Sequence, residues 1–562
     1  EGVIRHEPGT GAWQVTRDVE EIAMPDTLHG VLMARIDRLP TETKRVLQLA
    51  SVVGRVFQPR VLAELGSVSG LGLDEHLHVL QALDLIREGA RGPENVPSPG
   101  DRDFAYRFKH HLTQQAAYNS LLHKERRVFH RQVAEALKRL FPDRMWENAD
   151  LLAHHWQQAG EPKHAIPHLI RAGQRAMMHL AHVEARAHLQ RARTLAQEAE
   201  LMLAEAAALE QLAEAGRYRG DYVDAKTHIQ EALSIYRTFS NRRREAKLLS
   251  DLGRLARLEG DYAEAEARYT QMLELARLTR SWADEAKALS NLGTLCRNRG
   301  AYAAALAHFE RSLRLSRAMK HEEGQRIGLS NLGTLYRILG KYGEAEACFE
   351  EAEQSLSRRF NHSGAQRWGQ AILLNHKAAL AHDRGDDEWA YALVQQSYRI
   401  SQGINDRVGQ AYALTLIGRV LIGLGRLAEA EDAYRRALDL HDDVEREYLT
   451  MAVLAGLAHI ALLQGELEQA LAHAEEVLAY MSQHPGLQAI AEPFGLYWIT
   501  YRVLGELQDP RAPQVLEAAC KMLRTRADAL PYEGLRRSFL RNVLIHQAII
   551  KEWEDKYEGH PD

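Results

Sequence analysis

The sequence predicts an all-α chain built around a long array of helical hairpins, because three positions recur in register. Glycine returns every 40 residues, with one interval of 45, at Gly220, Gly260, Gly300, Gly340, Gly385, Gly425, Gly465 and Gly505. Two residues later most copies have an aromatic residue or leucine: Tyr222, Tyr262, Tyr302, Tyr342, Leu427, Leu467 and Leu507. Alanine follows the glycine by five residues at Ala225, Ala265, Ala305, Ala345, Ala390, Ala430 and Ala470. Chance does not hold three positions in register over eight copies, so this internal repeat predicts the fold, and we name its glycine the turn glycine.

Length and composition indicate several domains or a solenoid in a reducing cytoplasm. At 562 residues the chain exceeds one globular core. A net charge of −5 favours neither nucleic acid nor an anionic membrane as the main partner, although a local basic face stays open. No apolar run approaches the roughly 18–20 residues of a membrane helix. The scattered cysteines, Cys296, Cys348 and Cys520, predict no disulfide framework or metal site.

The front of the chain predicts a piece of a larger protein. The chain begins at Glu1 without a secretory signal. Residues 1–24 predict a β-hairpin, with strands around Ile4 and Trp13 and a turn at Pro8-Gly9. A two-stranded hairpin is not stable alone, so we expect this one to be a remnant that joins a missing domain.

Residues 25–145 predict short helices and one strand. Helices are expected over 28–39, over 41–53 with Thr41 as N-cap, and over 59–65, 74–86 and 111–142. A loop over 91–102 precedes an alternating strand at 104–108. Three helices, a loop and a strand are typical of a winged-helix unit. No helix interleaves Arg, Lys and Asn as a DNA-reading helix does, so nucleic acid is not favoured as a partner.

The remainder divides into three parts. Residues 146–205 predict irregular helical repeats, in which Ala165 follows Gly160 by five residues. Residues 206–530 predict about eight regular hairpins. Residues 531–562 predict one helix that caps the last apolar face of the array.

A small residue recurs in the first helix of each hairpin, seven residues before the turn glycine: Ala213, Gly253, Gly293, Gly333, Ala378, Gly418 and Ala458. Glycine inside a helix costs about 1 kcal/mol relative to alanine, so its recurrence needs a reason. We expect the second helix to approach too closely here for a larger side chain. The turn glycine should end the first helix with a positive φ angle.

The array resembles the tetratricopeptide repeat. The small residue, the aromatic residue after the turn, the alanine and a second aromatic residue (Tyr269, Phe309, Phe349 or Tyr434) occur in the same order. The usual period is about 34 residues. Here the period is 40. The resemblance implies a right-handed superhelix whose inner face is lined by the first helices.

Polar residues repeat at two positions that the resemblance places on the inner face. The candidate ligand-binding residues are Ser250, Ser290 and Ser330, followed in each case by Asp251, Asn291 and Asn331, and an arginine row of Arg217, Arg257, Arg297 and Arg337. In tetratricopeptide proteins, asparagine at this offset often bonds the backbone of an extended ligand and basic residues take its carboxylates. An acidic partner is therefore expected. The alternative is that duplicated repeats share solvated polar residues that bind nothing.

The front of the chain resembles bacterial STAND-type signalling ATPases. The similar segments are Pro25–Pro40, Leu49–Phe57, Tyr106–His110, Ala117-Tyr118 and Leu121-Leu122. In that family they form a winged-helix module between a nucleotide-binding domain and a repeat sensor. The resemblance implies that His110 senses the nucleotide, and the alternative is an ordinary histidine of the fold. No G-x-x-x-x-G-K-[ST] motif occurs, so ATP or ADP is expected only with the missing ATPase domain and no cofactor in this chain.

Catalytic and metal-binding motifs are absent from the sequence. It contains no H-E-x-x-H, G-x-S-x-G or paired C-x-x-C motif, so we expect no enzyme activity. The adjacent pairs His110-His111 and His154-His155 should point to different sides of a helix, so they predict no metal site.

The leading hypothesis is the sensor part of a signalling ATPase. The repeats would bind a peptide, protein or small inducer on their inner face, and the winged helix would relay binding to the ATPase. Oligomerisation of the full-length protein is left open. Two alternatives remain: a winged-helix DNA-binding regulator with a repeat sensor, and a free-standing scaffold.

Overall fold

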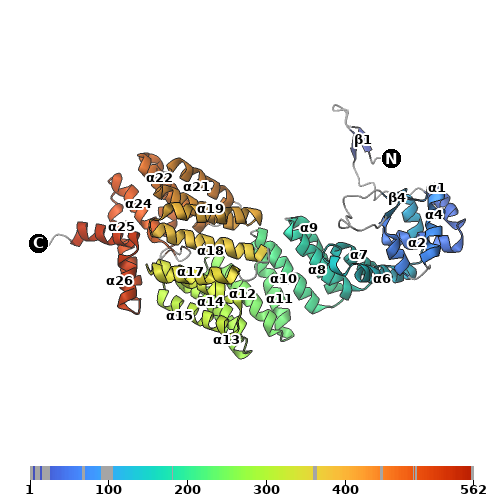
Figure 1. Cartoon of the computed structure of the whole chain (residues 1–562), viewed down its shortest axis with the longest axis horizontal. Coiled ribbons are helices and arrows are strands. Elements are labelled where there is room, and N and C mark those ends of the chain that lie inside the picture. The colour runs from blue at the N-terminus through green and yellow to red at the C-terminus, as the bar shows by residue number, and fades with distance from the viewer. Residues whose placement is uncertain are drawn as a thin grey trace. The chain divides into compact units, whose positions relative to one another are not determined.

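A computed structural model describes residues 4–6, 13–15, 26–65, 70–89, 105–179, 181–219, 221–357, 364–442, 447–484, 487, 490 and 492–558 (Figure 1). The chain divides into two compact units, residues 1–215 and residues 216–562, and each is described by itself.

The first unit begins with a β-hairpin. Strands β1 (Ile4–His6) and β2 (Trp13–Val15) pair antiparallel, with Ile4 opposite Val15. The hairpin expected within residues 1–24 is therefore present. Its turn lies outside the described residues.

Four helices and a small sheet follow. The helices are α1 (Asp26–Asp37), α2 (Thr41–Val53), α3 (Pro59–Glu64) and α4 (Gly70–Ala82). The strands β3 (Val56–Phe57), β4 (Ile86–Gly89) and β5 (Ala105–Phe108) form an antiparallel sheet of order β3-β5-β4. Leu47, Phe57, Leu77 and Phe108 are buried in one core. Of these three strands, the sequence predicted only β5. Strand β3 was missed because it has only two residues. Strand β4 was missed because Ile86, which lies opposite Phe108, was assigned to the end of a helix.

Two local expectations are wrong. Thr41 is the first residue of α2 rather than its N-cap, because Pro40 occupies the cap position. The long helix expected over 111–142 is two helices, α5 (His111–Asn119) and α6 (His123–Leu140). The Arg126 side chain donates to the carbonyls of Asn119 and Leu121 at 3.1 Å each. It thereby satisfies backbone groups that a helix end leaves unpaired.

The repeat pattern extends one hairpin further toward the N-terminus than expected. After α7 (Ala149–Gln158) come α8 (Pro162–Met178), α9 (His182–Glu198) and α10 (Met202–Arg219). In α8, a Cβ on Gly173 would lie 2.6 Å from Leu189 of α9. Gly173, Ala185 and Leu189 stand 40 residues before Ala213, Ala225 and Ile229. The match was missed because the sequence has Leu180 in place of the turn glycine.

The second unit is a succession of antiparallel helices (Figure 1). They are α11 (Tyr222–Thr238), α12 (Arg242–Leu258), α13 (Tyr262–Leu278), α14 (Trp282–Asn298), α15 (Tyr302–Ala318), α16 (Glu322–Ile338), α17 (Tyr342–Ser357), α18 (Gly364–Asp383), α19 (Asp387–Gly403), α20 (Arg407–Gly423), α21 (Leu427–Asp442), α22 (Glu447–Gln464), α23 (Leu467–Gln483), α24 (Phe494–Glu506) and α25 (Ala512–Asp528).

The turn glycines have the expected conformation in six described copies. Their φ angles are positive, from +69° to +84°, at Gly260, Gly300, Gly340, Gly385, Gly425 and Gly465. At the first of these, the N–H of Asp261 donates to the carbonyl of Ala256 at 2.8 Å, which closes the helix end. The expectation for Gly505 is wrong, because Gly505 lies within α24 and Gln508 takes the positive φ angle.

The small residue of each first helix faces a side chain of the second helix. A Cβ on Gly253, Gly293, Gly333 or Gly418 would lie 2.4–2.7 Å from the ring of Tyr269, Phe309, Phe349 or Tyr434, respectively. Where the corresponding side chain is not aromatic, the small residue is alanine, in the pairs Ala213/Ile229, Ala378/Val394 and Ala458/Ala474. The expected close approach is confirmed, and the sizes of the two partners compensate each other within one hairpin.

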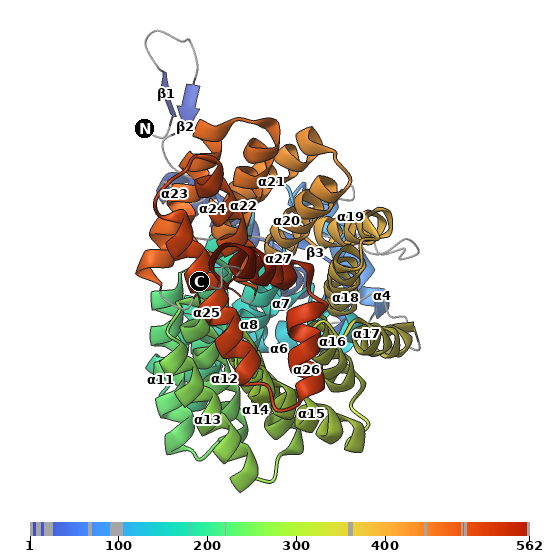
Figure 2. The ribbon, with the colours of Figure 1, turned by 90° about the vertical axis from the view of Figure 1, so that its left-hand side faces the viewer.

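The C-terminal part is two helices rather than one. They are α26 (Glu533–Arg541) and α27 (Leu544–Trp553), followed by a short π-helix, Glu554–Glu558. Figure 2 shows α25, α26 and α27, in red, in front of the repeat helices. Arg526 of α25 donates to the Tyr302 hydroxyl at 3.0 Å, and Asn542 donates to the Gly340 carbonyl at 3.0 Å. The C-terminus therefore packs back on turns about 200 residues earlier and shares a core with α15 to α17.

The fit between Gly293 and Phe309 predicts a compensating pair of substitutions. Gly293→Ala should lower the thermal unfolding temperature and cost about 1–3 kcal/mol through overpacking, although alanine is the better helix former. Phe309→Ile recreates the natural Ala213/Ile229 combination. The double variant should therefore be less destabilised than the sum of the single variants. Additive effects would contradict the proposed fit.

The docking of the C-terminal helices predicts a difference between two turn glycines. Alanine is strained at the positive φ of both Gly260 and Gly340. A Cβ on Gly340 would also lie 2.6 Å from the Ser538 carbonyl oxygen, whereas a Cβ on Gly260 meets nothing within 4 Å. Gly340→Ala should therefore cost about 1–3 kcal/mol more than Gly260→Ala. It should also speed hydrogen exchange in α26 and α27, and equal effects of the two substitutions would refute this docking.

Candidate functional site: the inner face of the repeats

Serine and asparagine from neighbouring hairpins form a ladder along the first helices. The Asn291 side-chain amide donates to the Ser250 hydroxyl at 3.1 Å, and Asn331 donates to Ser290 at the same distance. The hydroxyl of Ser330 is buried without a hydrogen-bond partner in the described part of the chain. In the next hairpin the asparagine position is His376, so the ladder ends there.

The ladder gives these polar residues a structural role. Each bond joins one hairpin to the next. This agrees with the alternative that duplicated repeats share these polar residues without binding a ligand. The binding role expected for Ser250, Ser290, Ser330, Asn291 and Asn331 stays a prediction. Asp251 accepts a hydrogen bond from Arg254 at 2.8 Å within its own helix.

The four arginines of the row differ in their burial and in their interaction partners. Arg217 is half-buried near the end of α10. Arg257 interacts electrostatically with the Tyr269 side chain. Arg337 is only 4% exposed and forms ion pairs with Asp383 and Glu492. Arg337, which was expected to hold a ligand, therefore holds two carboxylates of its own chain.

The ion pairs of Arg337 fix its charge. Burial alone would lower the pKa of Arg337, but Glu492 and Asp383 outweigh burial and raise this pKa well above its usual value. Burial would likewise raise the pKa of Glu492, and the positive charge of Arg337, with Arg419 and Arg297, lowers it instead. Arg337 and Glu492 are therefore both charged at neutral pH.

Arg297, like Arg257, has no carboxylate partner among the described residues. Its side chain is half-buried, and among the described residues no carboxylate lies within ion-pairing distance of it. Its Nε is buried without a hydrogen-bond partner in the same part of the chain. Burial and the neighbouring charge of Arg257 lower the pKa of Arg297 to about 10, so the guanidinium still carries its proton at pH 7.

Arg419 of α20 is a second such arginine. It is half-buried, its Nε has no partner among the described residues, and its charge acts on Glu492 as that of Arg297 does. Sequence reasoning missed it because the corresponding positions of the third and fourth hairpins are Thr294 and Thr334. No regular row therefore pointed to Arg419.

We name these charged groups the arginine cluster: Arg257, Arg297, Arg337, Arg419, Asp383 and Glu492. Four guanidinium groups face two carboxylates, which leaves the cluster two positive charges in excess. His376 adds no charge at neutral pH, because burial and the charges of Arg297 and Arg337 lower its pKa to about 3. The exposed Tyr412 of α20 also interacts with Arg297.

His110 occupies the place that the sequence predicted. It lies two residues after β5, is exposed, and stands at the cap position of α5. Its carbonyl accepts a hydrogen bond from the N–H of Thr113 at 3.1 Å. Its role in sensing a nucleotide stays a prediction.

Among the described helices, none combines the length and apolar character that crossing a membrane requires.

Comparison with known proteins identifies the repeats. One tetratricopeptide-repeat family model matches residues 204–278, 284–358 and 369–443, and a second matches residues 415–485. An uncharacterised Rhizobium meliloti protein, R02095, is 36% identical over 113 residues, which are 20% of this chain and 11% of that protein. The chain thus spans about a tenth of the length of this relative.

Two solved structures are similar to larger parts of the chain. The STAND protein with a tetratricopeptide repeat sensor PH0952 from Pyrococcus horikoshii is 11% identical, with a TM-score of 0.43 over 92% of this chain and 68% of that one. The apo form of the quorum sensor NprR from B. thuringiensis is 14% identical, with a TM-score of 0.40 over 63% of this chain and 97% of that one. On the family models, the matched residues between 204 and 485 are tetratricopeptide repeats.

Proposed function

We propose that this chain is the ligand-sensing module of a cytoplasmic signalling protein and that its repeats bind an acidic ligand at the arginine cluster. The observation that carries the proposal is the pair Arg297 and Arg419, two half-buried cations without carboxylate partners among the described residues. A cation removed from water costs free energy unless an anion pairs with it. A carboxylate or phosphate of a ligand would supply that anion through charge-assisted hydrogen bonds.

The asparagine ladder supports an extended ligand, such as a peptide. Asn291 and Asn331 are half-buried and each uses one N–H to bond serine. An asparagine amide has a second N–H and a carbonyl oxygen, which can pair with a peptide backbone. Since the ladder already fixes the amide orientation, little conformational entropy would be lost on binding. A small acidic inducer would need only the arginines.

The relay to an output domain is the second part of the proposal. Helices α2 to α4 and the sheet of order β3-β5-β4 support the assignment of a winged helix. By resemblance, this module would couple ligand binding to an ATPase domain outside this chain. His110 at the end of β5 would face the nucleotide of that domain.

The charge of α4 does not favour the DNA-binding alternative. In a winged helix that reads DNA, the helix corresponding to α4 enters the major groove. Here α4 carries Asp74 and Glu75 and contains no lysine or arginine. Its charge would repel phosphates.

The binding proposal predicts the effect of neutralising the two arginines. The full chain would be screened by thermal shift against acidic peptides, small polycarboxylates and phosphorylated compounds, and the hits measured by calorimetry. The variant Arg297→Gln/Arg419→Gln should bind a hit at least tenfold more weakly, because a charge-assisted hydrogen bond contributes about 1.5–3 kcal/mol.

The matched control is Arg314→Gln, which removes an arginine whose side chain is 68% exposed on α15. This variant should bind like the wild type. Equal affinity of the double variant and the control would refute the arginine cluster as the site.

The acidic residues of α4 and its lack of lysine and arginine predict weak and unselective interaction with DNA. In gel shifts, the full chain should not retard duplex DNA selectively at physiological salt. Asp74→Lys/Glu75→Lys should increase non-specific, salt-sensitive retardation by adding phosphate contacts. Sequence-selective, salt-sensitive binding by the wild-type chain would instead support the DNA-binding regulator.

A further inference from the structure

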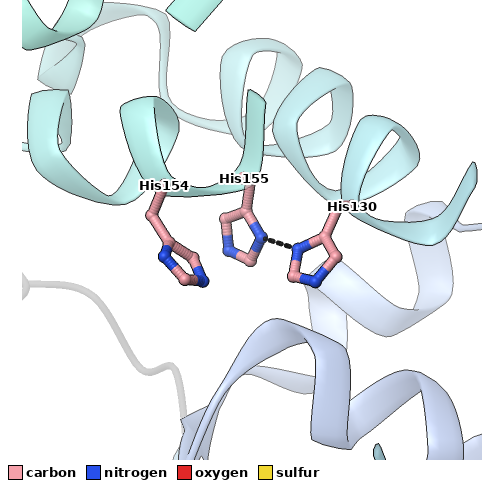
Figure 3. Close-up of side chains that lie close together, drawn as sticks. All are labelled: His130, His154 and His155. Carbon is pink, nitrogen blue, oxygen red and sulfur yellow. Dashed lines mark hydrogen bonds between the residues drawn. The ribbon is translucent and has the colours of Figure 1, made fainter. Parts of the chain in front are cut away.

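Three histidines that are apart in sequence lie together in the first unit. His130 of α6 faces His154 and His155 of α7 (Figure 3). One ring nitrogen from each lies within 4.8 Å of the others. His130 and His155 are buried, whereas His154 is exposed and opens the cluster to solvent. The expectation that adjacent histidines cannot share a site overlooked the third histidine on a neighbouring helix.

The nitrogen atoms of the cluster have an unusual arrangement of partners. The Nδ1 atoms of His130 and His155 are 2.8 Å apart, so a single proton must lie between two ring nitrogens. The Nε2 of His130 lies 2.9 Å from the Tyr118 hydroxyl. The Nε2 of His155, a residue only 1% exposed, has no partner among the described residues. Only one of the two Nδ1 atoms can carry the proton, so the other presents a lone pair toward the same place.

The histidines are neutral at pH 7 and therefore able to bind metal. Burial, together with the charges of His154 and Arg126, lowers the pKa of His130 to about 4. Burial also lowers the pKa of His154 and, with its two histidine neighbours, that of His155. A metal ion competes with protons for the imidazole lone pair, so these neutral rings would release few protons on binding.

We propose that His130, His154 and His155 bind a divalent transition-metal ion of the Zn²⁺ class. Imidazole suits Zn²⁺, Ni²⁺ and Cu²⁺, whereas Mg²⁺ and Ca²⁺ prefer oxygen ligands. Three histidines leave a fourth position on the exposed side of His154 for water. The ion would take the place of the shared proton between the two Nδ1 atoms and join α6 to α7. That proton would move to the Nε2 of its own ring, so both rings stay neutral.

Tyr118 supplies the supporting contact that such a site requires. A histidine ligand almost always donates its other ring N–H to a neighbouring acceptor, which fixes the ring orientation. The Nε2 of His130 is placed to donate to the Tyr118 hydroxyl while Nδ1 binds the metal. Arg126 lies over the Tyr118 ring at 4.6 Å and is already bonded to the carbonyls that end α5.

A second group in the same unit provides the control. Asp150, Glu184 and His188 also lie close together. However, Asp150 already forms an ion pair with Arg175, so a cation is present without a metal. This group is therefore the weaker candidate.

The test titrates the metal-free full chain with Zn²⁺ by calorimetry and with Co²⁺ by visible absorption. We expect one saturable ion and the intense absorption of tetrahedral Co²⁺. His154→Ala should weaken binding at least tenfold and leave the circular dichroism unchanged, because its side chain is exposed. Tyr118→Phe should weaken binding about tenfold through the supporting contact. His188→Ala should bind like the wild type.

Three results would overturn the metal site. They are the absence of saturable binding by the wild type, wild-type affinity in His154→Ala, and loss of binding in His188→Ala alone. Since the readout is metal affinity, failure here leaves the arginine cluster and its ligand unaffected.

Discussion

The contact between a small residue on one helix and a bulky side chain on the next determines most of this structure. In the hairpin of α14 and α15, Gly293 leaves room for the ring of Phe309, and the two helices approach along their length. Such a contact excludes water from a wide strip of apolar surface, which is the main favourable term in folding. Because the same contact recurs in each hairpin, it sets the spacing between helices. It thereby also sets which faces of the first helices are left for polar residues.

The arginine cluster depends on this spacing and on the return of the C-terminus. Arg297, Arg337 and Arg419 come from three first helices, whereas Glu492 comes from the segment before α24. Glu492 and Asp383 pair with Arg337, and with Arg257, Arg297 and Arg419 the cluster keeps two positive charges in excess. The charged residues of the first helices therefore have different partners from one repeat to the next, although the repeats are similar. Selectivity for a ligand would arise from this difference.

The sequence predicted what is local and periodic. The positive φ angle of Gly260 and the pairing of Gly293 with Phe309 follow from a register that any copy of the repeat displays. Contacts between distant segments were not predictable in this way. Nothing periodic connects Arg337 to Glu492, or His130 to His155, because each pair joins segments that follow no common register. These two failures lie where tertiary packing brings unlike segments together.

The docking of the C-terminal helices on earlier turns also depends on the number of hairpins in between. Asn542 bonds the carbonyl of Gly340, and Arg526 lies over Gly300, so two turns act as fixed landmarks for the end of the chain. Each hairpin carries its own internal fit, and one more copy would add a sound piece of core. A copy inserted between Gly340 and α25 would also shift α25 to α27, and these helices would then miss both landmarks. A solenoid can usually gain or lose repeats freely, but this one must keep the number of hairpins between Gly340 and α25 for its C-terminal helices to dock.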